Sequence, residues 1–321
     1  MKILLLVGGG LGDIFLHFYS NAVFQILAEV SIKNHVDALC MCSNPASKSV
    51  LGSMMNGNGN PLFENITYKN FWWDKSYPDE YNVFIKSYTD LGYHVLKGYD
   101  DTPTMIDVLN TFYPHFTELG FYSKRIHWFD YKLTYQEQEF FNSVSDLDYI
   151  IVHPSGGLQA VDGITRDEYG ELIKKLLVEF PEKHIIAIGS NHTRLWIDKI
   201  TLLPNDMKVS FTESEFNMQY NRFIDLTNKT SGALCAKIVE KASCFVGTHS
   251  CWIALFSFFK KPTVCILSND TDWGTAENYI KTNAFNWMFS KPYVYTAIVN
   301  KPLDELYNEV IDNLKGLING S

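Results

Sequence analysis

Short, uninterrupted apolar runs recur along the chain, and each is followed directly by small or polar residues. The four clearest read ILLLVGGG (3–10), YIIVHPSGG (149–157), HIIAIGS (184–190) and CFVGTHS (244–250). An apolar run without polar alternation is typical of a parallel strand covered on both faces. Because segments with helical spacing of apolar residues follow these loops, the sequence predicts an α/β fold built on parallel sheets.

The length of the chain predicts two domains. Its 321 residues, 46% of them hydrophobic, exceed one typical core. We expect an N-terminal domain over 1–145, a C-terminal domain over 146–300, and a final amphipathic helix within 301–321 that packs back toward the N-terminal domain. In the less regular part of the first domain, we expect a strand at YNVFI (81–85) and a helix near 104–112.

Charge and cysteine content narrow the class of protein. The chain has 27 basic and 36 acidic residues, a formal charge of -9, so it has no general attraction to nucleic acid or to an anionic membrane surface. Six cysteines without a CxxC pair fit a reducing compartment. The first apolar run lacks a cleavage site, and no run approaches the ~20 residues that cross a bilayer. We expect a cytoplasmic protein without a transmembrane segment.

The first glycine-rich loop, GGGLGD, departs from the dinucleotide-binding fingerprint. Two of its glycines fit GxGxxG, but Asp13 stands at the third position, where close helix packing requires a small residue. Asp13 fits two roles. A carboxylate at a helix start caps free N–H groups, and a carboxylate beside glycines can also serve as a general base for a hydroxyl nucleophile.

Loops at the carboxyl ends of the later strands are candidates for anion binding. In open α/β sheets the ligand lies beyond these strand ends, and N–H groups of small residues there suit a diphosphate. Arg166 follows soon after, where a guanidinium could hold a phosphate, although a solvated arginine is the simpler alternative. His249 could be a hydrogen-bond donor, an acid, a base or a structural residue. The candidate residues for binding the diphosphate of a ligand are Ser155, Gly156, Gly157, Arg166, Ser190, Asn191, Thr248, His249 and Ser250.

Several of these stretches together resemble one family. GGGLGDIFLHFYSNAVFQIL, VHPSGG and DLTNKTSGALCAKIVEKASCFVGTHSCWIALFSFFKKPTV (225–264) are similar to the motifs of the lipopolysaccharide heptosyltransferase-like glycosyltransferases of family 9. The resemblance implies a GT-B fold, with two Rossmann-like domains and parallel sheets facing across a central cleft. It also implies that Asp13 is the catalytic base, that Gly10, Leu11 and Gly12 lie on the acceptor side, and that loops 153–157 and 247–250 hold a nucleotide-sugar diphosphate.

The chain departs from the family pattern at four positions of its longest motif. His249 replaces the aspartate of Asp-Ser-Gly, Cys251 replaces its glycine, and Ala254 replaces a later histidine. Asn228 replaces the glycine of Gly-Lys-Thr-Ser. These changes fall where the donor would be contacted.

The sequence therefore predicts an inverting glycosyltransferase that moves a sugar from a nucleotide-diphosphate donor to an acceptor hydroxyl of a glycan or lipopolysaccharide. No HExxH, EF-hand or zinc spacing is present, so we expect no metal and no cofactor beyond the nucleotide sugar. Two alternatives stay open. One is a bacteriophage-type enzyme that glycosylates hydroxylated DNA bases; the other is a catalytically silent module that binds a sugar or nucleotide.

Overall fold

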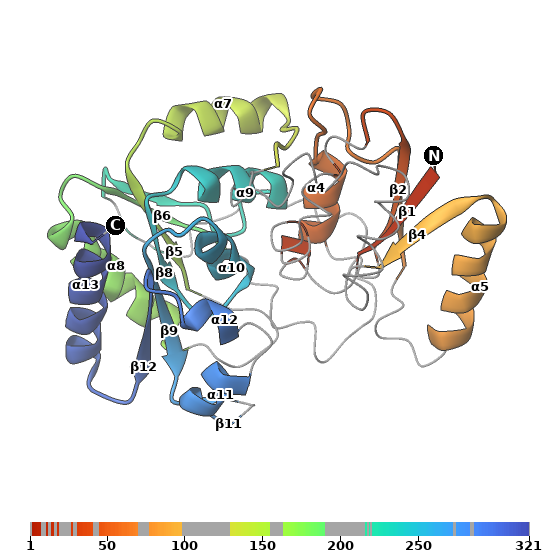
Figure 1. Cartoon of the computed structure of the whole chain (residues 1–321). Helices are drawn as coiled ribbons and strands as arrows, with labels where there is room; N and C mark the ends of the chain where they lie inside the picture. The colour runs from red at the N-terminus through yellow and green to blue at the C-terminus, as the bar shows by residue number, and fades with distance from the viewer. Residues whose placement is uncertain are drawn as a thin grey trace. The chain divides into compact units, whose positions relative to one another are not determined.

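The structure is a computed structural model of the chain (Figure 1). It describes residues 2–7, 11, 14–15, 18, 27, 31–40, 45–69, 77–97, 129–154, 163–189, 216, 218, 220–271, 274–282 and 286–320. The chain forms two compact units. The first comprises Met1–Glu137 with Ser231–Lys237, and the second comprises Gln138–Thr230 with Ile238–Ser321.

The first unit contains a four-stranded parallel sheet in the order β3-β2-β1-β4. Its described elements are β1 (Lys2–Val7), β2 (His35–Cys40), α4 (Pro45–Ser53), β3 (Asn65–Tyr68), α5 (Tyr77–Asp90) and β4 (Tyr93–Lys97), and α7 (Tyr135–Val144) crosses from this unit to the next. From its second residue onward β1 is at most 2% exposed. Burial on both faces explains its uninterrupted apolar run.

The prediction of a strand at 81–85 is wrong, because these residues lie inside α5. Tyr81, Phe84, Ile85 and Tyr88 have the spacing of one helix face, and they pack against a cluster of β1 and β2 leucines. The apolar run was too short to distinguish a strand from one helix face. The helix predicted near 104–112 lies outside the described residues.

The second unit contains a six-stranded parallel sheet in the order β12-β9-β8-β5-β6-β7. Its elements are β5 (Tyr149–His153), α8 (Arg166–Glu179), β6 (His184–Ala187), β7 (Phe223–Asp225), β8 (Cys244–Gly247), α10 (Cys251–Phe258), β9 (Thr263–Ser268), β10 (Asp270–Thr271), β11 (Gly274–Thr275), α11 (Ala276–Thr282), α12 (Asn286–Phe289), β12 (Val294–Val299) and α13 (Leu303–Asn319). The helix α9 (Gly232–Lys241) is divided between the two units. Most of α9 and its neighbour Ser231 belong to the first unit, which no sequence pattern predicts.

The strand order reverses between β5 and β8. From β5 the chain continues outward to β6 and β7, whereas β8 continues to β9 and β12 on the other side. In open α/β sheets this topological switch point is where ligands bind, beyond the carboxyl ends of the two strands. His153 and Gly247 are partners in the parallel register at this edge.

The two faces of this sheet are covered by different helices. Ile150 and Val152 of β5 join the core beneath α8 and α13. The side chains alternate along a strand, so Tyr149 and His153 point to the opposite face, where the Tyr149 hydroxyl donates to the Ile238 carbonyl of α9 at 2.6 Å. α10 covers the same face, with its Phe256 ring 5.1 Å from the Phe245 ring of β8 (Figure 1).

The final helix, α13, packs on the core of the second unit, and its expected return toward the first unit stays a prediction. Leu306, Tyr307, Val310 and Leu314 of α13 are at most 3% exposed, and they belong to the core formed with β5, β8 and α8. The apolar stripe is long enough to be buried entirely against its own sheet. In the part of the chain that the structure describes, no helix is long and apolar enough to cross a membrane.

Candidate functional site

Many of the predicted site residues lie outside the described residues. They are Asp13, Gly10, Gly12, Ser155, Gly156, Gly157, Ser190 and Asn191. Leu11, the remaining residue of the acceptor-side loop, is half-buried. The described part of the candidate site is therefore the carboxyl edge of the second sheet, with Arg166, Thr248, His249 and Ser250 among the predicted residues.

His153 ends β5 at the switch point, and its imidazole is buried with only 5% of the residue exposed. Within the described chain, its Nδ1 atom has no hydrogen-bond partner. Burial lowers the pKa of His153 to about 3, and the positive charge of Arg166 adds to this effect. The side chain is therefore a neutral imidazole with one unsatisfied nitrogen, an arrangement that costs stability.

Two glycines let neighbouring strands approach this histidine closely. A Cβ on Gly247 would lie 2.5 Å from the His153 carbonyl oxygen, so no other residue fits without moving the backbone. The next residue, Thr248, is fully buried and donates its N–H to the same carbonyl at 3.1 Å. Gly189, just after β6, has φ +140°, and a Cβ there would lie 3.5 Å from the His153 ring. The edge is thus compact around His153.

Ser250 precedes α10 as its N-cap residue in an extended conformation. Its side chain makes no capping hydrogen bond, and its buried Oγ has no partner among the described residues. Ser250 therefore does not cap α10 through its side chain. The first-turn N–H groups of α10 point beyond the carboxyl edge of the sheet with the partial positive charge of a helix N-terminus.

His249 lies between these residues and is 9% exposed. Its Nδ1 is hydrogen-bonded to the hydroxyl of Tyr279, which belongs to α11. The Phe289 ring of α12 lies 5.5 Å from the His249 ring. Burial lowers the pKa of His249 to about 4, so this imidazole is also neutral near pH 7.

The loop between β7 and α9 explains one departure from the family motif. Asn228 has φ 58°, a left-handed conformation that glycine adopts freely and that asparagine tolerates better than most residues. Its N–H donates to the Gly189 carbonyl at 2.8 Å. The loop is held by Asp225, whose side chain accepts from the Thr227 N–H at 3.0 Å and whose carbonyl accepts from Lys229 Nζ at 2.9 Å. Asn228 therefore holds a left-handed conformation that a glycine would adopt freely.

Arg166 is the first residue of α8 and is half-buried. The helix starts with a capping box in which Thr165 accepts from the Glu168 N–H and Glu168 accepts from the Thr165 N–H. This box fixes where Arg166 leaves the backbone. Its guanidinium is near enough to His153 to lower the pKa of that imidazole, but its contact with a ligand stays a prediction.

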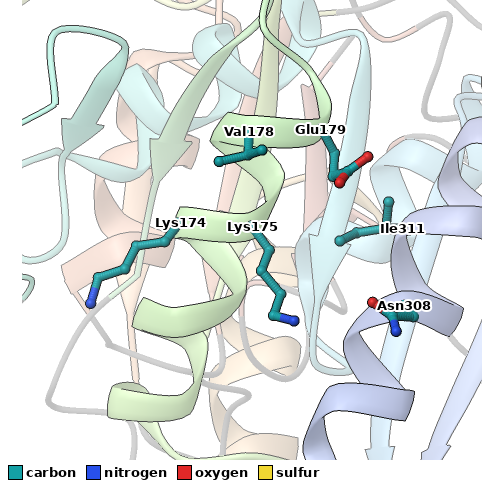
Figure 2. A pocket seen from close by; sticks show the side chains of 6 residues that line it. All are labelled: Lys174, Lys175, Val178, Glu179, Asn308 and Ile311. Carbon is teal, nitrogen blue, oxygen red and sulfur yellow. The ribbon is translucent and has the colours of Figure 1, made fainter.

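A groove of about 220 Å³ lies elsewhere, between α8 and α13 (Figure 2). Its lysines are already paired, because Lys174 contacts Glu171 at 2.6 Å and Lys175 contacts Asp304 at 3.0 Å. It lies on the face of the sheet opposite to His153 and α10. Its lining residues are Lys174, Lys175, Val178, Glu179, Asn308 and Ile311. The groove is therefore separate from the candidate site.

Sequence reasoning did not single out two residues of this edge. His153 was included only as the first residue of the loop 153–157, although a histidine that ends an apolar strand just before a proline could have been singled out. Tyr279 lies 30 residues beyond His249, and no local pattern connects the two. Within the described residues, no group of three or more histidine, cysteine, aspartate or glutamate side chains could hold a metal ion.

Comparison with known proteins shows a likeness in structure. No protein-family model and no curated protein sequence matches the chain. The ADP-heptose lps heptosyltransferase II of E. coli superposes with a TM-score of 0.52 and 13% identity, over 100% of this chain and 99% of that chain. A glycosyl transferase family 9 structure from Veillonella parvula gives a TM-score of 0.53 and 13% identity, over 100% and 97%. The chain therefore has the GT-B fold, and its resemblance to the heptosyltransferase-like glycosyltransferases of family 9 is confirmed at the level of the fold.

Proposed function

We propose that the chain is an inverting, metal-independent glycosyltransferase that moves a sugar from a nucleoside-diphosphate donor to an acceptor hydroxyl, as on a glycan. The fold that it shares with a heptosyltransferase and a family 9 glycosyltransferase supports this class. Fold alone does not assign chemistry, and the residues that support this reaction lie at the carboxyl edge of the second sheet.

One observation carries the proposal: two buried polar atoms without partners lie on neighbouring connections at the switch point. His153 Nδ1 and Ser250 Oγ both lack a hydrogen bond within the described chain. His153 ends β5, and Ser250 is the N-cap residue of α10, the helix that follows the adjacent strand β8. Helix N–H groups and a hydroxyl are donors that suit the oxygens of a diphosphate.

The proposed reaction is a single displacement at the anomeric carbon of the donor sugar. The acceptor oxygen forms the new C–O bond while the bond to the diphosphate breaks, and the acceptor proton passes to the Asp13 carboxylate. Negative charge grows on the leaving diphosphate, where the α10 N-terminus, Ser250 and Arg166 would stabilise it in place of a metal ion. General-base assistance of this kind contributes ~10²–10⁴-fold in rate.

A donor screen tests the proposal. Thermal unfolding is measured with ADP, UDP, GDP, CDP and their sugar conjugates, and a bound nucleotide at 100 times its Kd should stabilise the fold by about 2.7 kcal/mol. If none of these compounds raises the unfolding temperature, the proposed function is refuted.

The chain offers a matched control for the donor site. Ser257 lies near the other end of α10, and its Oγ is also buried without a hydrogen-bond partner among the described residues. Ser250→Ala should weaken binding of the selected nucleotide about fivefold to tenfold, whereas Ser257→Ala should leave it unchanged. Equal effects of the two variants would place the nucleotide elsewhere.

Two measurements distinguish the proposed enzyme from the binding module and from the DNA-base glycosyltransferase. A silent binding module would bind the nucleotide sugar but form no glycoside with hydroxyl acceptors, and Asp13→Asn would then change nothing. A DNA-base glycosyltransferase would bind duplex DNA with an affinity that falls steeply as salt rises, in spite of the net charge of -9.

A further inference from the structure

Tyr279 contacts His249, the histidine that stands where the family motif has an aspartate. Its hydroxyl is hydrogen-bonded to His249 Nδ1, and the two rings meet edge to face with centroids 5.5 Å apart. Tyr279 is 1% exposed, and the Phe289 ring lies 5.5 Å from the His249 ring and 6.5 Å from the Tyr279 ring. Residues of α11 and α12 thus hold the side chain of His249, which lies in the loop after β8.

The direction of the hydrogen bond between Tyr279 and His249 determines which imidazole nitrogen carries the proton. Burial raises the pKa of Tyr279, so its hydroxyl keeps its hydrogen and can donate. Burial lowers the pKa of His249 to about 4, so the imidazole is neutral and carries one ring proton. A phenol that donates to Nδ1 leaves this proton on Nε2, since the hydrogen bond of one ring nitrogen determines the state of the other.

We propose that Tyr279 is a positioning residue for the donor site: it holds His249 as the Nε2-protonated, neutral tautomer and thereby helps to bind the nucleotide sugar. This inference rests on the proposed function for its ligand. An Nε2–H group donates to an oxygen, such as one of the diphosphate or a sugar hydroxyl. The aspartate of the family motif would instead place an acceptor and a negative charge there.

The first test reads the tautomer without any ligand or turnover. Long-range ¹H–¹⁵N spectra of the full chain with ¹⁵N-labelled histidine distinguish the two neutral forms, and the His249 signals are identified by their loss in His249→Asn. We expect the Nε2–H form in the wild type and a mixture of both forms in Tyr279→Phe. The Nδ1–H form in the wild type, or an unchanged spectrum in Tyr279→Phe, overturns the proposal.

A control variant separates positioning from loss of a buried hydroxyl. Tyr293→Phe makes the same chemical change in the same unit, where the hydroxyl donates to the Ser257 carbonyl at 2.8 Å. Tyr293→Phe should leave the His249 spectrum unchanged. Circular dichroism confirms that both variants fold, and a change of the His249 signals in Tyr293→Phe as large as that in Tyr279→Phe counts against a specific role.

The second test uses the nucleotide sugar selected by the donor screen. Tyr279→Phe should raise its KM about fivefold to tenfold with little change in kcat, because a hydrogen bond made equally in ground and transition states affects binding alone. The acceptor KM should stay constant. An unchanged donor KM with an altered tautomer overturns the binding role. Failure of every nucleotide to bind the wild type refutes the proposed function and with it the ligand, while the tautomer result still decides the positioning of His249.

Discussion

Acidification should destabilise the second unit through the buried imidazole of His153. Its pKa is about 3 in the folded chain against an ordinary value of 6.5, so the folded state excludes a proton that the unfolded state binds. Stability from this group is complete above pH 6.5 and is lost as pH falls from 6.5 toward 3. At pH 5, about 1.5 pH units below the ordinary pKa, the free energy of unfolding falls by about 2 kcal/mol, since each pH unit contributes about 1.36 kcal/mol.

The comparison with His153→Phe isolates this contribution. Phenylalanine keeps a ring beside Phe245, whose ring centroid lies 6.5 Å from that of His153, and it removes the unsatisfied nitrogen. Urea unfolding at pH 7 and pH 5, followed by circular dichroism, gives the free energy of unfolding of each protein. The wild type should lose about 2 kcal/mol more than His153→Phe between the two pH values. The wild type and Tyr293→Phe should lose equal amounts, because the pKa of Tyr293 is raised above an already alkaline value. Equal losses in the wild type and His153→Phe would refute the reasoning.

Three further predictions concern the backbone and the proposed base. Gly247→Ala should destabilise the second unit by ~1–3 kcal/mol, because its Cβ would meet the His153 carbonyl oxygen, whereas Gly316→Ala, in open space on α13, should stabilise it by ~0.5–1 kcal/mol. Urea unfolding measures both, and equal signs would contradict the packing described. Asn228→Ala should cost ~1–2 kcal/mol at φ 58° and Asn228→Gly much less, so a tolerated alanine would argue against the left-handed conformation. Asp13→Asn should keep nucleotide binding and lose ~10²–10⁴-fold in transfer rate, and near-normal turnover would exclude Asp13 as the base.

The sequence by itself determined the elements that carry the candidate site. The apolar runs at 3–7, 149–152 and 244–246 are β1, β5 and β8, because burial on both faces of a sheet leaves no polar alternation. The glycine at 247 and the small residues after it mark the loop at the switch point, since close approach of two strands permits no side chain there.

Only the tertiary structure decided which distant residues meet. Residues 81–85 form one face of a helix and not a strand, because this face covers the leucine cluster of β1 and β2. That α13 stays on its own sheet depended on the core it completes there. The contact between His249 and Tyr279 joins residues 30 positions apart, and His153 is covered by Phe245 of β8 and by Gly189, just after β6. Local patterns specify periodicity and turns, whereas packing between distant segments determines burial, pKa and hydrogen-bond partners.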